Sequence, residues 1–128
     1  KIYIYGGIIM NIEKSLKLHE KWLKGETGGK CADFKGINLK NVSFENANLE
    51  GASFIGSEIY SVSFKGANLE NADFICTEID GTNFENTNLK NADFKFAEIA
   101  KIDCVSFKGA NLEDTKINYK YFNEFFKA

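Results

Sequence analysis

The 128-residue chain has no arginine, no proline, one histidine and three cysteines. The lack of arginine argues against a protein that binds nucleic-acid phosphates, because such proteins concentrate Arg and Lys on one face. The three cysteines, Cys31, Cys76 and Cys104, form no C-x-x-C pair. An odd number of cysteines is also a poor basis for a disulfide framework. With no cluster of metal ligands or nucleophiles, we expect a reduced, cytoplasmic protein that is not an enzyme and has no catalytic residues, no cofactor and no metal.

The length of the chain allows one domain, and its composition supplies enough apolar residues for a hydrophobic core. Hydrophobic residues make up 44% of the chain and aromatic residues 14%, so the composition is not that of a disordered protein. Sixteen lysines against eighteen acidic residues leave a net charge of −2. The apolar runs are short, so we expect no membrane span, no membrane contact and no direct binding to nucleic acid.

Residues 1–10 precede the patterned part of the chain and are interpreted as a leader. The Gly6–Gly7 pair lies just before Met10, and a ribosome-binding sequence can encode such a pair. We therefore expect Met10 to be the natural start and residues 1–9 to be non-native. The alternative is a genuine edge strand, because this segment is rich in Ile and Tyr, which favour strands.

A five-residue repeat dominates residues 32–117. The third place of each five is large and apolar, the first is small or β-branched, and the other three are mostly polar or Gly. Neither the 3.6-residue period of a helix nor the alternation of a long strand fits this pattern. We interpret each five as a very short strand followed by a corner. The third places are Phe34, Leu39, Phe44, Leu49, Phe54, Ile59, Phe64, Leu69, Phe74, Ile79, Phe84, Leu89, Phe94 and Ile99.

A second period of twenty residues sets the number of corners per coil. Every fourth five matches best, so each coil has four sides, and identical side chains should stack into two columns of Phe and two of Leu or Ile at about 4.8 Å spacing. Residues 105–113 repeat residues 62–70 at an offset of 43 instead of 40. This predicts a three-residue insertion within 100–104, after which Phe107 continues the column of Phe44.

The fives Ala-Asn-Leu-Glu-Gly (47–51), Ala-Asn-Leu-Glu-Asn (67–71) and Ala-Asp-Phe-Lys-Gly (32–36) resemble the A-(D/N)-L-x-x signature of pentapeptide-repeat proteins. The resemblance covers residues 32–117. It implies an all-β solenoid, a right-handed quadrilateral β-helix of about four coils, and the handedness comes from the resemblance alone.

Two caps are expected at the ends of the solenoid, where open ladder edges invite aggregation. At 11–31 we predict a capping helix and turn, with Asn11 as N-cap, Gly25 at the helix end and a structural His19 on the packed face. At 118–128 we predict a short aromatic helical cap. Its aromatic residues exceed what one small coil needs, which suggests a homodimer; a monomer with a well-filled cap is the alternative. The candidate dimer residues are Tyr121, Phe122, Phe125 and Phe126.

One outward surface stands out as a candidate for binding a protein. Three glutamates should stack at ladder spacing and repel one another, which folding does not require. Beside them, two outward isoleucines and two aromatic residues give an apolar spot rimmed by acids. The alternative is that the acids only keep the protein soluble. The candidate residues are Ile55, Glu58, Tyr60, Ile75, Glu78, Phe96 and Glu98.

The sequence thus favours a non-enzymatic protein-binding or scaffold module whose partner is unknown. The resemblance implies an alternative, because some pentapeptide-repeat proteins mimic duplex DNA and bind or protect a type II topoisomerase (DNA gyrase). Residues 32–117 hold fourteen acidic residues and eight lysines, a net charge of −6. The lysines are interspersed and the rod is short, which weakens this alternative. Outward threonine rows, which an ice-binding solenoid needs, are not expected, since Thr77, Thr82 and Thr87 occupy inward places.

Overall fold

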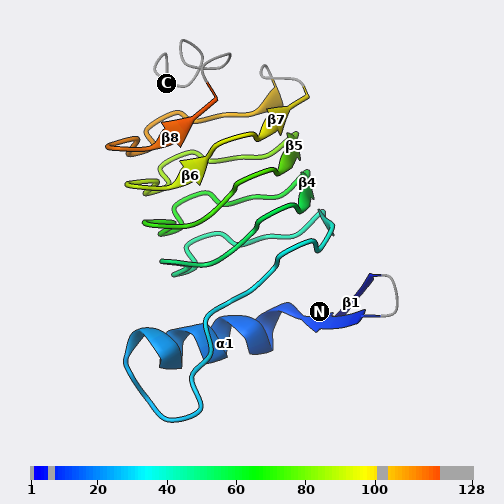
Figure 1. Cartoon of the computed structure of the whole chain (residues 1–128), viewed down its shortest axis with the longest axis vertical. Coiled ribbons are helices and arrows are strands. Elements are labelled where there is room, and N and C mark those ends of the chain that lie inside the picture. The colour runs from blue at the N-terminus through cyan, green and yellow to red at the C-terminus, as the bar shows by residue number, and fades with distance from the viewer. Residues whose placement is uncertain (1, 6–7, 101–103, 119–128) are drawn as a thin grey trace.

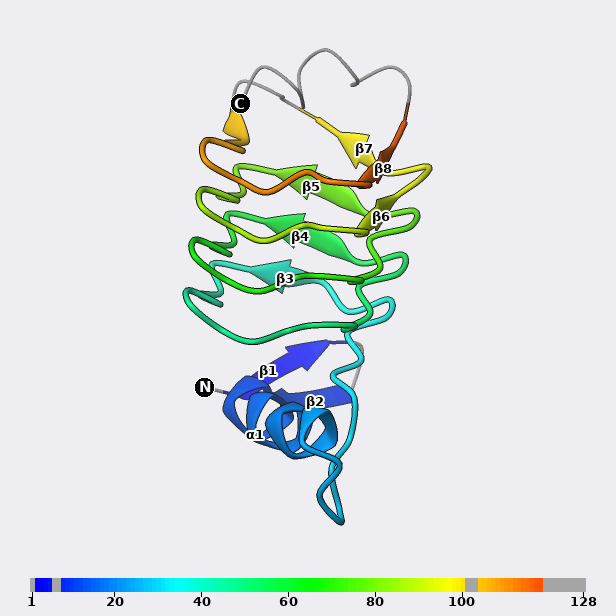
Figure 2. The same ribbon diagram turned by 90° about the vertical axis from the view of Figure 1, so that its left-hand side faces the viewer.

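The chain winds into a stack of flat coils that rests on an N-terminal helix and hairpin (Figures 1 and 2). This computed structural model describes residues 2–5, 8–100 and 104–118. The four aromatic residues proposed for dimerisation lie outside the described residues, as does the predicted C-terminal cap apart from Asn118. None of the helices in the described segments is long and apolar enough to cross a membrane.

The chain begins with an antiparallel hairpin of strands β1 (Ile2–Tyr5) and β2 (Ile8–Asn11), in which Tyr3 pairs with Met10. The first residues therefore form strands, as the alternative interpretation of the leader proposed. Whether residues 1–9 are native stays a prediction.

Helix α1 (Ile12–Leu23) begins and ends at the predicted residues. The side chain of Asn11 accepts a hydrogen bond from the backbone N–H of Lys14 at 3.0 Å, which satisfies one of the free donors of the first turn. At the other end Gly25 has a φ of +69°, and its N–H donates to the carbonyl of Trp22 at 3.1 Å. Such a left-handed glycine is a common helix terminator, because it lacks a Cβ.

Parallel pairing joins each coil to the next. Strands β3 (Leu39–Lys40), β4 (Glu58–Tyr60), β5 (Glu78–Asp80) and β7 (Glu98–Ile99) form one sheet along one side, and β6 (Asp93–Phe94) pairs with β8 (Lys116–Ile117) on another (Figure 2). Isolated parallel bridges continue the ladder on the other sides. Most of these pairings join residues twenty apart, which confirms the predicted length of the coil and its four sides.

The pairing also confirms the insertion. Ile79 pairs with Ile99, twenty residues on, whereas Asn83 pairs with Ser106, which is twenty-three residues on. Phe107 then stacks on Phe84 with a centroid distance of 5.0 Å, so it continues the column of Phe44 as predicted. Residues 101–103 lie outside the described segments, so the predicted bulged corner stays a prediction.

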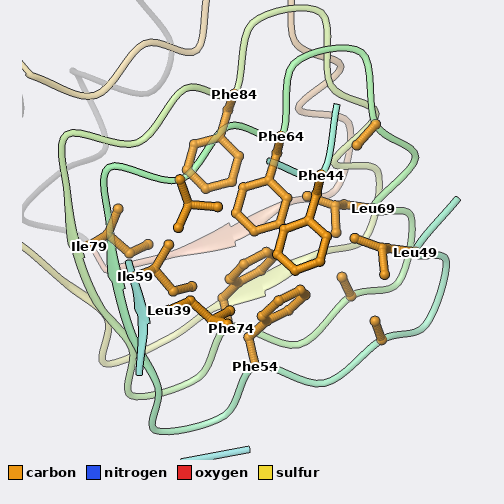
Figure 3. Packing of buried hydrophobic residues seen from close by; sticks show 14 of the residues in the cluster. Leu39, Phe44, Leu49, Phe54, Ile59, Phe64, Leu69, Phe74, Ile79 and Phe84 are labelled. Atoms are coloured by element: carbon orange, nitrogen blue, oxygen red, sulfur yellow. The ribbon is translucent and has the colours of Figure 1, made fainter. Parts of the chain in front are cut away.

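The interior is filled by two columns of phenylalanine rings that interlock (Figure 3). Within a column the rings stack in parallel: the centroids of Phe54 and Phe74 are 4.8 Å apart, and those of Phe74 and Phe94 are 4.6 Å apart. Between columns the rings meet edge to face, as Phe64 and Phe74 do at 5.8 Å. Both arrangements are favoured by the ring quadrupole. The predicted inward threonines are buried, and their hydroxyls donate to backbone carbonyls, as that of Thr77 does to Phe74 at 2.8 Å.

Every described corner is made by a residue in the left-handed backbone region, at the fifth place of the repeat. Gly and Asn hold most of these positions because they tolerate positive φ. Asp114, Ser61, Cys76 and Phe96 are the other residues there, with Cys76 at +59° and Phe96 at +60°. Among these, the bulky Phe96 is the outlier.

Short polar side chains at the second place of the repeat hold the turns. The carboxylate of Asp73 accepts the backbone N–H of Ile75 at 2.9 Å, and Asn83 accepts that of Glu85 at 2.8 Å. Such a bond closes an Asx-turn, which explains why Asp, Asn and Ser recur at this place. The side with strands β4, β5 and β7 carries glutamate there instead.

Candidate functional site

The seven residues predicted to bind a protein come from three successive coils and flank one corner of the solenoid. We call this surface the Phe96 corner. It lies where the side that begins with Ser53, Asp73 and Asp93 meets the side that carries strands β4, β5 and β7. Its residues are Ile55, Glu58, Tyr60, Ile75, Glu78, Phe96 and Glu98.

Ile55 and Ile75 lie on successive coils just before the corner. The N–H of Gly56 donates to the carbonyl of Ile75 at 2.9 Å, which aligns the two coils at this point. Both isoleucines are half-buried and belong neither to the buried core nor to the residues packed against it. They are therefore outward apolar side chains, as the repeat predicted.

Phe96 lies at the corner itself, where the two coils below carry Gly56 and Cys76. Its side chain is 71% exposed, the larger of the two exposures found for big hydrophobic residues in the described segments. Phe96 was expected near the isoleucines, but its left-handed backbone was not foreseen. This backbone could have been predicted from the sequence, because Phe96 holds the fifth place of the repeat, where corners need a positive φ.

The glutamates stack as predicted. Glu58 pairs with Glu78, and Glu78 pairs with Glu98, in adjacent parallel strands. However, the middle carboxylate has a partner that the sequence analysis missed: the hydroxyl of Tyr60 donates a hydrogen bond to Oε2 of Glu78 at 2.9 Å. Tyr60 was expected beside the apolar spot, and its hydroxyl instead bonds within the acidic ladder.

This hydrogen bond and the surrounding carboxylates change the acidity of the phenol. They raise the pKa of Tyr60 from about 10 to about 12, first through the hydrogen bond to Glu78, then through partial burial and the charges of Glu58, Glu78 and Asp80. Tyr60 is therefore a neutral hydrogen-bond donor at all physiological pH values.

Negative charge is concentrated around the Phe96 corner in the three coils that form it. Residues 52–61, 72–81 and 92–100 contain six acidic residues and one lysine. That lysine, Lys95, forms an ion pair with Asp93 at 3.6 Å. On the other two sides, residues 62–71, 82–91 and 105–114 carry four acidic residues and three lysines. The net charges of −5 and −1 describe these three coils only. With residues 32–51 and 115–117 included, both pairs of sides carry a net charge of −3, so the excess of negative charge is local to the Phe96 corner.

His19 joins the helix to the first coil. Its Nδ1 accepts the backbone N–H of Ala32 at 2.9 Å, and its ring stacks on Trp22 at 5.3 Å. The side chain is fully buried, and Nε2 has no hydrogen-bond partner in the described structure. Burial lowers the pKa of His19, while the backbone carbonyl and charge of Glu50 partly oppose this. These contacts support the predicted structural role.

The cysteines are not brought together. Cys76 and Cys104 are exposed and Cys31 is half-buried, and all three are free thiols. Burial, followed by the charge of Asp33, raises the pKa of the Cys31 thiol, which makes it a poorer nucleophile. In the segments that the structure describes, no three His, Cys, Asp or Glu side chains form a group that could hold a metal ion.

The fold is thus a four-sided parallel β-solenoid with a five-residue repeat. A sequence model described as the pentapeptide repeat region matches residues 37–118. The chain belongs to the pentapeptide-repeat family, whose fold is a right-handed quadrilateral β-helix. A search of the curated proteins found no match.

Solved structures of this family resemble the chain. A pentapeptide-repeat protein of the Arabidopsis thaliana thylakoid lumen is 30% identical, with a TM-score of 0.42; the match covers 66% of this chain and 60% of that protein. One from Nostoc PCC 7120 is 18% identical over 85% of this chain and 90% of that one, with a TM-score of 0.41. QnrB1, a plasmid-mediated fluoroquinolone resistance protein, is 13% identical over 77% and 70%, with a TM-score of 0.26.

Proposed function

We propose that this protein is a non-enzymatic module that binds another protein through the Phe96 corner. The observation that carries the proposal is the 71% exposure of Phe96, which lies one coil up from the outward, half-buried Ile75 at the neighbouring place of the repeat. Exposed apolar residues that lie together and are rimmed by polar groups mark interaction sites on soluble proteins. The interlocked Phe columns fill the interior, so binding has to use the outer surface.

The test is affinity capture from the native host with the wild-type chain and two matched variants. Ile75→Glu places a charge at the fourth place of the repeat on the Phe96 corner. Lys65→Glu puts a glutamate at the same place on the side of Phe64, where it reverses an existing positive charge, and serves as the control. We expect a defined partner to be captured by the wild type and the control but not by Ile75→Glu, with all three melting at similar temperatures. Capture that is indifferent to Ile75→Glu would contradict the proposal.

A second candidate is a DNA mimic that binds or protects a type II topoisomerase. The observation in its favour is the concentration of acidic residues around the Phe96 corner in residues 52–61, 72–81 and 92–100. Against it, about four coils at roughly 4.8 Å each give a rod of only about 20 Å, or about six base pairs. A supercoiling assay of DNA gyrase with a fluoroquinolone, with and without the protein, tests this candidate. Unchanged inhibition at a large excess of the protein would exclude it.

The oligomeric state remains a separate proposal, based on the aromatic content of the C-terminal segment. We propose a homodimer that forms through Tyr121, Phe122, Phe125 and Phe126. Analytical ultracentrifugation of the wild type and of a Phe122→Ser, Phe125→Ser double variant is the measurement. A monomeric wild type would refute the dimer and leave the Phe96 corner unaffected.

A further inference from the structure

We propose that the Phe96 corner binds a basic protein segment, with an apolar side chain of the partner against Phe96 and Ile75 and its Lys or Arg side chains against the glutamate ladder. This inference rests on the proposed function and specifies the chemistry of the partner. It is carried by the exposure and backbone of Phe96, the apolar residues below it and the charge around it.

Phe96 occupies a position where the fold itself favours other residues. A left-handed backbone costs a residue with a Cβ about 1–2 kcal/mol, and at φ +60° this applies to Phe96. Its ring is 71% exposed, so the ring gains little burial to offset that cost. Glycine holds the same corner two coils below, at Gly56. A partner that covers the ring would supply the missing burial.

The apolar surface extends down the stack from Phe96. Cys76 lies one coil below at the same corner and is exposed, and its N–H donates to the carbonyl of Lys95 at 3.0 Å. Ile75 and Ile55 precede the corner on that coil and on the next one down. The strip therefore spans two ladder steps, or about 10 Å. Phe96 lies at one end of the strip as an aromatic residue of the kind that anchors binding hot spots.

The charge around the strip selects a cationic partner. In residues 52–61, 72–81 and 92–100, which form the Phe96 corner, six acidic residues outnumber one lysine, and this Lys95 is already paired with Asp93 at 3.6 Å. Like charge disfavours a nucleic acid, an anionic lipid surface and a second copy of this same face. A segment with Lys or Arg beside an apolar residue matches both the charge and the exposed ring, to which a cation can also bind directly.

The carboxylates on the two sides differ in the hydrogen bonds that they accept. Asp73 and Asp93 each accept a backbone N–H two residues ahead, at 2.9 and 3.0 Å, so they hold turns. Glu78 holds no turn; it accepts from the hydroxyl of Tyr60, which leaves its carboxylate charge on the exposed ladder. The glutamate ladder is therefore the part of the acidic surface whose charge the turns do not need.

Three synthetic peptides of equal length test the proposal, each with a central Leu-Phe pair flanked by Lys, Gln or Glu. Binding is measured by fluorescence anisotropy at low and at physiological salt. We expect the Lys-flanked peptide to bind at least about tenfold more tightly than the other two, and added salt to weaken it. Phe96→Asn should weaken its binding at least about tenfold, whereas Phe96→Tyr should preserve it. Glu78→Gln should weaken it more than the control Glu113→Gln does.

The other outcomes separate this proposal from the proposed function. Equal binding to wild type and Phe96→Asn would mean that charge alone attracts the peptide, and the anchor role would be overturned. Equal affinity for all three peptides would overturn the preference for a basic partner. If no peptide binds but capture from the host still depends on Ile75, the basic partner is wrong and the binding module stands. If capture is also independent of Ile75, the proposed function itself fails.

Discussion

The hydroxyl of Tyr60 donates a hydrogen bond to Oε2 of Glu78 at 2.9 Å, and this bond joins side chains on successive coils. The bond is the largest of the causes that raise the pKa of Tyr60 to about 12. We therefore predict that at about pH 11 Tyr60 is still mostly protonated in the wild type and largely ionised in Glu78→Gln. The measurement is NMR titration with labelled tyrosine, and the Tyr60→Phe variant assigns the signal. Coincident titrations in the two proteins would mean that the bond does not persist in solution.

The same bond changes the expected effect of Glu78→Gln on stability. From the repulsion of stacked carboxylates alone, the substitution should leave the free energy of unfolding unchanged or raise it slightly, and this is what we expect in a Tyr60→Phe background. In the wild type the substitution also removes a charge-assisted hydrogen bond, which opposes this gain. The change in the free energy of unfolding should therefore be less favourable in the wild type than in the Tyr60→Phe background, by a few tenths of a kcal/mol. Urea denaturation of the four proteins of this cycle measures the difference.

Replacing Phe96 should stabilise the isolated protein. Asparagine tolerates a left-handed backbone and loses little burial at a site that is 71% exposed, so Phe96→Asn should raise the free energy of unfolding by about 0.5–1 kcal/mol. Phe96→Ala keeps the backbone strain and is the control, for which we expect no gain. Thermal and urea unfolding measure both. A less stable Phe96→Asn would show that the ring has an intramolecular contact worth more than the strain.

Two corner glycines differ in what a methyl group would meet. Gly56 and Gly66 have φ values of +67° and +69°; a Cβ on Gly56 would point into open space, whereas one on Gly66 would strike Oδ1 of Asn46. Gly56→Ala should cost about 1–2 kcal/mol from backbone strain alone, and Gly66→Ala should cost more. The excess should vanish in an Asn46→Gly background. Equal losses at the two sites in the wild-type background would place the Asn46 side chain elsewhere.

Inward and outward places of the repeat should differ sharply in their effect on stability. Phe74 is completely buried between Phe54 and Phe94, so Phe74→Ala should cost about 3–5 kcal/mol. Glu85 accepts a hydrogen bond from the Ser106 hydroxyl at 3.2 Å, and glutamine can still accept it, so Glu85→Gln should cost under about 0.5 kcal/mol. Chemical denaturation of the two variants makes the comparison, and similar midpoints would refute the assignment of faces.

The joint between helix and solenoid should weaken in acid. Because the folded-state pKa of His19 is below its ordinary value of 6.5, the unfolded chain binds more protons between the two pKa values. Stability should therefore fall as the pH drops below about 6.5 and towards the folded-state pKa. His19→Asn, which cannot titrate, should lose less stability than the wild type between pH 8 and pH 5.5 in urea unfolding. Equal losses would mean that protonation of His19 is not coupled to folding.

Most of the fold could be predicted from the sequence because each coil repeats the same steric requirements. The third-place residues are buried, Phe107 rejoins its column, and Asn11 and Gly25 bound the helix, all as the pattern indicated. For the N-terminal segment an edge strand was considered only as an alternative, and its pairing as a hairpin was not predicted. Its strand-forming residues lie outside the repeat, so the periodic pattern gave no information about their pairing.

The candidate site was predictable only in part. Stacking of Glu58, Glu78 and Glu98 follows from the twenty-residue period. The bond from Tyr60 to Glu78 does not, because it depends on the rotamer of a long side chain that reaches across one coil. The backbone strain at Phe96 could have been predicted from the sequence, since its place in the repeat requires a positive φ.

The twenty-three-residue step between Asn83 and Ser106 shows that the length of a coil can change while its stacking does not. The three extra residues enter between Ile99 and Ser106, and the next Phe and Asn still fall in register on Phe84 and Asn88. The stacking of the columns is therefore independent of the number of residues between Ile99 and Ser106. The chain between these two residues can thus gain length without any change in the columns that hold the protein together.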